Sequence, residues 1–405
     1  MDKRRPVVSR GHSLPSTADV VVIGGGILGC CAAYHLRLAG AGRVVLLERE
    51  PALATQTTWA GAGFVALWSA CGETCEPELS LERYALDFYS DLSSRHAIGL
   101  KQVGMLWLAT AAPTASTQRD LYALARTRVS AEEVALLTPD EAVALVPMLE
   151  PGCISSALYW PTACRVSAPL AARAVGAELI AAGVDVLTAT EVIGVDVVSG
   201  RVAGVRTTLG TIATGAVVNA AGAWLDRIAR MAGVVIPLVP LPASRFVTEP
   251  LPEVTPDLPL LMFSDHHGMY IREEDGGLLI GSEEIVVHPP SLMRLLRNGG
   301  QGVPGNVAAL ADNTHRYHRT IARDLAGVLP VLERIIVREV RNGMPTRTPD
   351  LRHLLGAAPE VGGFYLLGAD CEIGVTHGPG LGWQLADLIV HGRSTLDLSP
   401  FRPAR

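Results

Sequence analysis

A glycine-rich turn between a strand-like run and a helix-like stretch constrains this chain most strongly. Residues 19–36 read DVVVIGGGILGCCAAYHL, and the β-branched run Asp19–Ile23 is typical of a fully buried parallel strand. Gly24, Gly26 and Gly29 follow at G-x-G-x-x-G spacing. The first glycine permits a tight turn, the second lets the backbone approach a pyrophosphate, and the third lets helix and strand pack closely. The pattern predicts a dinucleotide-binding unit, the alternative being a turn of the same shape without a ligand.

The next strand supports that prediction, because it ends in an acid. Arg43–Leu47 reads as a second strand, and Glu48 follows it 24 residues after Gly24. A carboxylate there can accept a hydrogen bond from a ribose hydroxyl and disfavours a 2′-phosphate. The residues that this unit is expected to bring to the nucleotide are Gly24, Gly26, Ile27, Leu28, Gly29, Glu48 and Arg49.

Three later segments favour FAD over NAD. After Glu48 comes ALATQTTWAGAGFV, whose hydroxyls can donate to phosphate or flavin and whose glycines allow close backbone approach; a solvent loop is the alternative. A strand at Ala216–Asn219 ends in small residues, which suit a backbone facing a cofactor or a tight strand–helix joint. These segments add Thr57, Thr58, Trp59, Gly61, Ala62, Gly63, Val192, Ala220, Ala221, Gly222 and Trp224 to the expected cofactor site.

The third segment lies near the C-terminus. A strand at Phe364–Leu367 precedes GADCEIGVTHGPGLGWQLADLIVHG, in which we expect a glycine-rich loop and then a helix over roughly Gly380–Val390. A second glycine-rich helix start suits a flavin, whose ring lies far from its adenine end, and the helix dipole would stabilise the reduced ring. This segment adds Gly374, Val375, Thr376 and His377 to the expected cofactor site.

Composition excludes several partners. The net charge of −6 gives no reason to expect nucleic acid or an anionic membrane as a partner. Seven cysteines form no disulfide framework, which favours a reduced, cytoplasmic setting, and the Cys71–Cys75 spacing alone is a weak metal signal. The basic and polar residues 1–17 read as a flexible tail, and a length of 405 residues suggests two subdomains.

Five stretches together resemble the glycine oxidase, sarcosine oxidase and D-amino acid oxidase superfamily. They are VVVIGGGILG, TTWAGAG, VVNAAGAW, NGMPTRTPDLRHLLG and GVTHGPGLGWQLADLIVHG, and TTWAGAG with Thr348–Asp350 is most similar to dimethylglycine and sarcosine dehydrogenases. The resemblance implies an α/β fold with a discontinuous Rossmann-type FAD-binding domain over 18–90, 151–228 and 340–400. A substrate domain of α+β type with a large antiparallel sheet would come from 91–150 and 229–339. Short strands at Arg245–Pro250, Gly268–Glu273 and Gly277–Glu284 agree with that sheet, and helix-like spacing follows between 290 and 325, broken at Gly299–Pro304.

This chain departs from its relatives at four positions. Ala60 and Gly343 stand where relatives with covalent flavin carry a histidine or a cysteine, so we predict non-covalent FAD. Pro345 and Thr376 stand where an arginine or a lysine pairs the substrate carboxylate in glycine or sarcosine oxidases. The substrate is therefore held differently, or it is not a simple glycine derivative.

Other residues are then candidates for holding a substrate. Arg245 could clamp a carboxylate with its planar guanidinium, Tyr270 lies on a strand where the superfamily places substrate-contacting aromatics, and Arg347 could replace the missing arginine. Each has a plainer alternative, a surface arginine, a packed sheet tyrosine or a solvated loop arginine. His377 is the one candidate catalytic side chain, and no metal site is expected.

The resemblance implies an FAD-dependent amine oxidase acting on a CH–NH donor. A hydride would pass from the α-carbon of an N-substituted, glycine-like amino acid to flavin N5, the imine would hydrolyse to a carbonyl acid such as glyoxylate plus an amine, and O2 would become H2O2. Some relatives use such chemistry in antibiotic biosynthesis. The alternatives are a dehydrogenase subunit that passes electrons to a partner protein and a flavin-bound protein without catalysis. The sequence leaves the amine, the electron acceptor and the oligomeric state open.

Overall fold

The computed structural model describes residues 14–72, 76–282, 303, 305, 307 and 322–405. Four sequence expectations therefore lie wholly or partly outside the described residues. They are the tail over 1–17, Cys75 of the cysteine pair, the end of the strand expected to reach Glu284, and the helix-like spacing between 290 and 325 with its loop at Gly299–Pro304.

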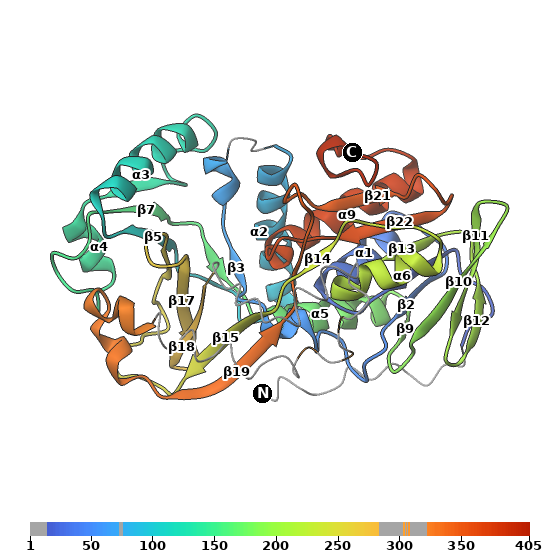
Figure 1. The fold of residues 1–405 in the computed structure, drawn as a ribbon, viewed down its shortest axis with the longest axis horizontal. Coiled ribbons are helices and arrows are strands. Elements are labelled where there is room, and N and C mark those ends of the chain that lie inside the picture. The colour runs from blue at the N-terminus through green and yellow to red at the C-terminus, as the bar shows by residue number, and fades with distance from the viewer. Residues whose placement is uncertain (1–13, 73–75, 283–302, 304, 306, 308–321) are drawn as a thin grey trace.

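A six-stranded sheet forms the core of one half of the molecule, at the right of Figure 1. Its strands, in sheet order, are β21 (Leu354–Ala357), β22 (Phe364–Gly368), β13 (Val217–Asn219), β1 (Val20–Ile23), β2 (Val44–Leu47) and β9 (Asp185–Leu187). Neighbours pair in parallel except β21 and β22. Strands from three distant parts of the chain thus lie side by side, as the sequence predicts.

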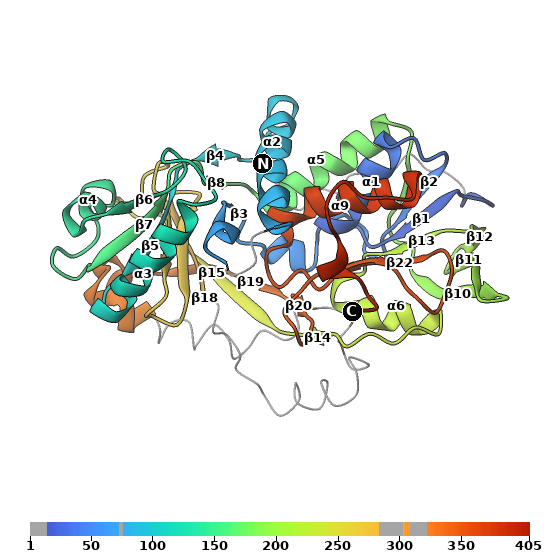
Figure 2. The same cartoon turned by 90° about the horizontal axis from the view of Figure 1, so that it is seen from above.

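Alternation along β1 assigns the two faces of this sheet. Val20 and Val22 pack with α1 (Ile27–Leu38), α2 (Glu78–Arg95), α5 (Ala168–Ala181) and α9 (Gly374–His391). Val21 and Ile23 pack instead with α6 (Leu225–Met231) and the three-stranded sheet of β10 (Val192–Val198), β11 (Arg201–Thr207) and β12 (Gly210–Ala213). Figure 2 shows the helices α1, α5 and α9 on one side of the sheet and α6 on the other. A strand apolar on both faces is what a sheet covered on both sides requires.

An eight-stranded sheet forms the other half. Its strands, in sheet order, are β19 (Val337–Gly343), β15 (Ala243–Thr248), β18 (Gly277–Ser282), β17 (Met269–Glu274), β16 (Leu260–Phe263), β5 (Met105–Ala109), β7 (Ser156–Trp160) and β6 (Ala135–Leu137). All neighbours are antiparallel except β5 and β16, whose parallel pairing joins the two chain segments that build this sheet. The predicted mixed α/β architecture is confirmed.

The remaining described elements complete the two halves and the region between them. They are β3 (Phe64–Val65), β4 (Lys101–Gln102), β8 (Cys164–Arg165), β14 (Val239–Pro240), β20 (Thr346–Arg347), α3 (Ala112–Ala125) and α4 (Pro139–Leu145), with 3-10 turns η1 (Thr57–Ala60), η2 (Trp68–Cys71), η3 (Gly222–Trp224), η5 (Leu325–Gly327), η6 (Pro330–Arg334) and η7 (Ser399–Phe401). β7 belongs to the eight-stranded sheet although the sequence analysis placed residues from 151 onward in the FAD-binding part. The limits of the two domains stay a prediction.

The C-terminal helix differs from expectation at its start. α9 begins at Gly374, not near Gly380, so its glycines lie inside the helix. A Cβ added to Gly382 would lie 2.7 Å from the Cys31 carbonyl carbon of α1, and one on Gly380 would lie 2.7 Å from the Leu81 side chain of α2. The glycines therefore allow close helix packing, and that packing outweighs their poor helix propensity.

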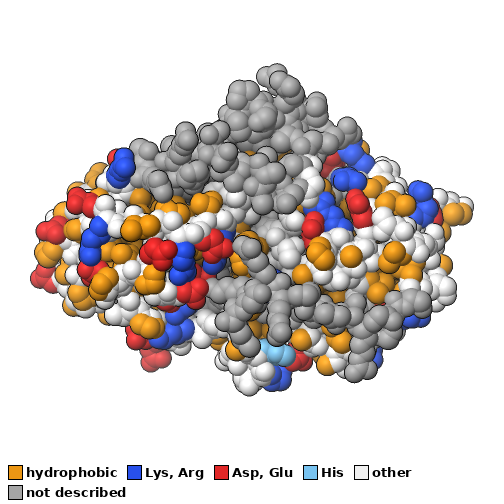
Figure 3. All heavy atoms as spheres, turned by 90° about the horizontal axis from the view of Figure 1, so that it is seen from below, with side chains coloured by type: hydrophobic (Ala, Val, Ile, Leu, Met, Phe, Trp, Pro, Cys, Tyr) orange, Lys and Arg blue, Asp and Glu red, His pale blue; other side chains and the backbone are white. Residues whose placement is uncertain are grey.

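Charges are mixed on the described surface. On the face in Figure 3, acidic and basic side chains are interspersed and apolar ones are scattered among them. Within the described ranges, no helix combines the length and apolarity needed to cross a bilayer.

Candidate active site

Two pockets adjoin at the carboxyl ends of the six-stranded sheet. The first, which we call the long cleft, is lined by residues that follow β1, β2, β13 and β22. The second, the inner pocket, shares Gly61, Arg245, Glu372 and Val375 with it. Ligands of parallel α/β sheets bind at this edge.

The glycines at the start of α1 form a backbone cradle in the long cleft. Gly24 has φ +113°, and a Cβ there would lie 2.4 Å from the Ala220 carbonyl oxygen. A Cβ on Gly29 would lie 1.9 Å from the Gly24 carbonyl oxygen. On Gly26, by contrast, a Cβ would meet only the Thr58 hydroxyl, at 3.2 Å. Gly24 and Gly29 are thus required by the fold, whereas Gly26 keeps space free at the helix N-terminus.

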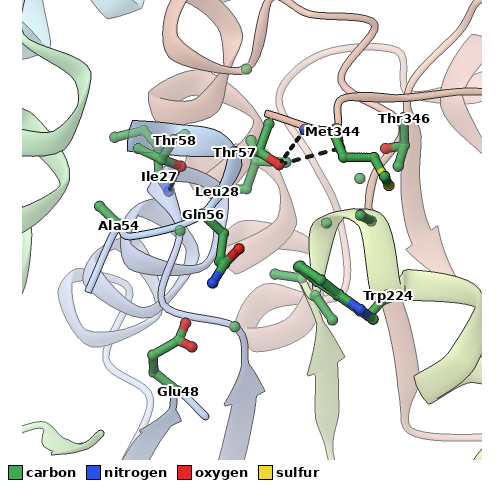
Figure 4. Close-up of a pocket in the computed structure, with 18 of the residues that line it drawn as sticks. Ile27, Leu28, Glu48, Ala54, Gln56, Thr57, Thr58, Trp224, Met344 and Thr346 are labelled. Atoms are coloured by element: carbon green, nitrogen blue, oxygen red, sulfur yellow. Dashed lines mark hydrogen bonds between the residues drawn. The ribbon is translucent and has the colours of Figure 1, made fainter. Parts of the chain in front are cut away.

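Glu48 lies at the bottom of this cradle and holds the turn in place. Its carboxylate accepts hydrogen bonds from the backbone amides of Gly25 (2.7 Å) and Glu50 (2.8 Å), and burial raises its pKa. The neighbouring Arg49 places its guanidinium 3.8 Å from the centre of the Trp224 ring, and both residues line the cleft. Figure 4 shows Glu48 and Trp224 on different walls of this space.

Two threonines of η1 tie the cleft together. The Thr58 hydroxyl accepts from the Ile27 amide (3.1 Å), while the Thr57 hydroxyl accepts from the Met344 amide (3.1 Å) and donates to its carbonyl (3.2 Å). Figure 4 shows both threonines, with the Thr57 bonds crossing to Met344. The loop read as hydroxyl-rich in the sequence therefore joins the N-terminal turn to the chain that follows β19.

The expected cofactor residues lie as follows. The long cleft is lined by Gly24, Gly26, Ile27, Leu28, Glu48, Arg49, Thr57, Thr58, Gly61, Val192, Ala220, Ala221, Gly222, Trp224, Gly374 and Val375. Ala62, Gly63 and Thr376 line the inner pocket. Gly29, Trp59 and His377 line neither. Gly29 instead contacts Gly24, and Trp59 lies under the Arg341 guanidinium, 5.2 Å from the ring centre.

The inner pocket combines aromatic walls with charged groups. Phe64 stacks on Trp68 with ring centres 6.4 Å apart and meets Tyr270 edge-on at 5.6 Å. The remaining lining residues are Ala62, Gly63, Met262, Arg347, Leu351, Cys371, Ile373 and Thr376, besides the four shared with the long cleft. Such a pocket suits a small organic molecule with an apolar part and one charged group.

All three expected substrate residues line this pocket. Arg245 lies on β15 with its side chain 6% exposed and its guanidinium 5.6 Å from the centre of the Tyr270 ring. Arg347 donates to Glu372 at 2.5 Å, and Arg245 reaches the other Glu372 oxygen at 3.9 Å. The Nε of each arginine is buried and has no hydrogen-bond partner among the described residues. The Glu372 carboxylate was missed by the sequence analysis, because only the fold brings it beside these arginines.

His377 lies elsewhere than expected. It is fully buried in the first turn of α9, where it shares hydrogen bonds with His353 (2.7 Å) and Glu82 (3.2 Å), and Glu82 accepts from the Ser69 hydroxyl (2.6 Å). Burial raises the pKa of Glu82 to about 8 and lowers the pKa of His377 to about 4. At neutral pH both groups are therefore uncharged. His377 therefore takes part in the packing between α9 and α2 and lines neither pocket, and its catalytic role stays a prediction.

This buried cluster makes stability depend on pH. The folded protein keeps the Glu82 proton up to about pH 8, whereas an unfolded chain loses it near its ordinary value of 4.5. The resulting stabilisation is fully present below pH 4.5. It falls by about 1.4 kcal/mol for each pH unit above that value and is lost once the pH has risen through about 8. Glu82→Gln should therefore flatten the fall in unfolding free energy between pH 5 and 9. Chemical unfolding across that range measures it, with the exposed Glu132→Gln as control; equal slopes in Glu82→Gln and the parent would refute the assignment.

The cleft residues fit FAD as a non-covalent ligand. Its glycine cradle leaves backbone space at Gly26, and its walls extend from the adenine-side Glu48 to the start of α9, as an elongated dinucleotide requires. Ala60 and Gly343 lie against each other, a Cβ on Gly343 being 3.1 Å from the Ala60 Cβ, and neither residue type carries a nucleophilic side chain. In the described part of the chain, no group of three or more acidic, histidine or cysteine side chains is arranged to hold a metal.

Comparison with known proteins agrees with this geometry. The profile of the family described as DAO, FAD dependent oxidoreductase, matches residues 19–388. The mitochondrial sarcosine dehydrogenase of Mus musculus is 33% identical over 97% of this chain, which spans 42% of that protein's length. Among solved structures, L-proline dehydrogenase from P. horikoshii has a TM-score of 0.83 at 23% identity, covering 97% of this chain and 98% of its own. Glycine oxidase from Geobacillus kaustophilus has a TM-score of 0.77 at 24% identity, and the match covers 96% of this chain and 99% of that protein.

Proposed function

The chain belongs to the FAD dependent oxidoreductase family, and from this premise we propose that it oxidises the carbon beside the nitrogen of a carboxylate-bearing secondary amine, such as an N-substituted glycine. When bound, FAD supplies hydride acceptance at flavin N5. Water would hydrolyse the product imine to a carbonyl acid, such as glyoxylate, and a free amine. Dioxygen is the proposed final electron acceptor and would be reduced to H2O2.

One observation carries the proposal: the inner pocket opens onto the long cleft through shared residues and holds two arginines beside aromatic rings. Arginines whose buried Nε atoms have no hydrogen-bond partner among the described residues are suited to a carboxylate. Phe64, Trp68 and Tyr270 offer an apolar wall for an N-substituent. The names of the relatives, sarcosine dehydrogenase and glycine oxidase, support a small amino acid as substrate.

The parts of individual side chains follow from this arrangement. Arg245 would bind and orient the carboxylate, and Tyr270 would wall the pocket beneath it. Arg347 would act indirectly, since it already donates to Glu372. Burial raises the pKa of Cys371 to about 12, so its thiol keeps its proton and provides no base. Catalysis then depends on orientation and exclusion of water, which suits an amine that arrives uncharged.

FAD is proposed to be held without a covalent bond, because Ala60 and Gly343 carry no nucleophilic side chain. Acid precipitation of the yellow protein should therefore release all of its flavin into the supernatant as intact FAD. Absorbance of pellet and supernatant measures this. A pellet that stays yellow after washing in denaturant would overturn the assignment.

The substrate class is tested by anaerobic reduction. Sarcosine, glycine, longer N-alkyl glycines, proline and D-amino acids are added to the FAD-loaded protein without oxygen, and bleaching of the flavin absorbance is followed. Fastest bleaching by a secondary N-substituted glycine supports the proposal. Bleaching only by primary amines would contradict it, and no bleaching by any member would favour a flavin-bound protein without catalysis.

A dehydrogenase is the second candidate, favoured by the sarcosine dehydrogenase relative, of which this chain spans less than half. Mixing the reduced protein with air separates the two. Reoxidation faster than turnover supports the oxidase, and slow reoxidation with fast turnover on an artificial acceptor supports a dehydrogenase that passes electrons to a partner.

The described cysteines form no disulfide, which supports a reducing, cytoplasmic setting as part of the proposal.

A further inference from the structure

Resting on the proposed function, we propose that Glu372 restricts the inner pocket to amines bearing a single carboxylate. It would do so by neutralising one of the two arginines, so that one cationic anchor remains for the substrate. Glu372 would thus be a specificity-determining residue.

The position of Glu372 carries this inference. Its carboxylate lies between the two guanidinium groups, 2.5 Å from Arg347 Nη2 and 3.9 Å from Arg245 Nη2. It also lines both pockets, at the junction where a ligand in the inner pocket would face the long cleft. The glutamate thus occupies the place that a second substrate carboxylate would need between these arginines.

The backbone holds Glu372 there at a cost. Cys371 and Glu372 have φ of +48° and +74°, in the turn between β22 and α9. Side chains other than glycine rarely adopt this left-handed region, and residues kept there are concentrated at functional sites. A turn that needed only its shape would be made more easily with glycine.

The formal charge of the inner pocket explains why a substrate with one carboxylate would be preferred. The charged side chains among the inner-pocket lining residues are Arg245, Arg347 and Glu372, which give a formal sum of +1. One substrate carboxylate brings the sum to zero. A second carboxylate would have no remaining cation to pair with and would lie beside the Glu372 carboxylate, where the repulsion between like charges is costly.

The test uses two ligands that contain no amine and therefore cannot undergo the proposed amine oxidation. Methoxyacetate carries one carboxylate and diglycolate carries two, with an ether oxygen in place of the amine. Binding to the FAD-loaded protein is measured by calorimetry and by the change in flavin absorbance. The parent protein should prefer methoxyacetate, and Glu372→Gln should shift the ratio of the two Kd values toward diglycolate by at least tenfold, which is about 1.4 kcal/mol. The exposed Glu360→Gln is the matched control and should leave the ratio unchanged.

A second variant keeps the test decisive if Glu372→Gln does not fold. Arg347→Met leaves Glu372 to neutralise Arg245, so both ligands should bind more weakly and diglycolate should lose more. An unchanged ratio, or equal weakening of both ligands in either variant, would show that Glu372 only shapes the turn and would overturn the inference. If the parent binds neither ligand, the proposed carboxylate substrate is wrong as well. An unchanged ratio in a protein that binds both ligands would instead overturn only the role of Glu372, so the two failures can be distinguished.

Discussion

Gly26→Val should weaken FAD binding strongly while leaving the protein folded. A Cβ at this position meets only the Thr58 hydroxyl, so a larger side chain would project into the long cleft and not into the protein core. There it would fill the space at the N-terminus of α1 where a pyrophosphate is expected to approach the backbone. We expect FAD affinity to fall at least about 100-fold, or roughly 2.8 kcal/mol. Quenching of FAD fluorescence by the apoprotein measures the affinity, and circular dichroism checks the fold.

Two other glycines serve as comparisons. Gly29→Val should lower the thermal stability of the apoprotein itself, because its Cβ would lie 1.9 Å from the Gly24 carbonyl oxygen. Gly215→Val should change neither property, since a Cβ at the exposed Gly215 meets nothing within 4 Å. If Gly26→Val bound FAD as tightly as Gly215→Val does, the placement of the pyrophosphate would be wrong.

The nucleotide half was predictable because its signals are local. Strand, glycine turn, helix and acid follow one another within 30 residues of β1, and each has a steric or electrostatic reason that sequence spacing alone displays. Small residues after β13, such as Ala220 and Ala221, likewise mark a strand end that faces a ligand, and they line the cleft. The convergence of distant segments also followed, since parallel strands end at one edge.

The start of α9 was not predictable, because its glycines have a tertiary use. Read locally, the stretch from Gly374 to Gly378 indicates a loop before a helix that starts near Gly380, since glycine is unfavourable inside a helix. In the fold, Gly382 lies against the backbone of α1 and Gly380 against Leu81, contacts that no local pattern reveals. His377 was assigned to the flavin edge for the same reason, and the helix instead turns it toward Glu82.

Of the charged side chains in the inner pocket, the two arginines could be predicted from the sequence, whereas the glutamate could not. Arg245 and Arg347 could be proposed from residue type alone, because guanidinium is the preferred partner of a carboxylate. Their resident partner Glu372 comes from a third segment, in a turn with a backbone conformation that the sequence ADCE does not announce. Of the two arginines, Arg347 is therefore closely paired with Glu372 at 2.5 Å, whereas Arg245 is only loosely paired with it at 3.9 Å.

Arg245→Met is therefore the substitution expected to damage substrate binding most. The side chain is 6% exposed and its Nε has no partner in the part of the chain that the structure describes, so a substrate carboxylate would gain a charge-assisted hydrogen bond to a buried guanidinium. Truncating one partner of such a buried pair costs about 2–5 kcal/mol. We expect the Kd for methoxyacetate to rise at least tenfold and anaerobic bleaching by an N-alkyl glycine to need correspondingly more substrate. FAD content should stay unchanged, because the cradle around Gly26 lies elsewhere in the cleft.

The matched control is Arg338→Met, which removes the same charge from an exposed position on the neighbouring strand β19. Because surface charges contribute little, this variant should bind methoxyacetate as the parent does. A selective loss in Arg245→Met assigns the carboxylate to this guanidinium, since net charge falls equally in both variants. Equal affinities in the two variants would instead place the carboxylate away from Arg245 and would remove the premise on which a single-anchor pocket rests.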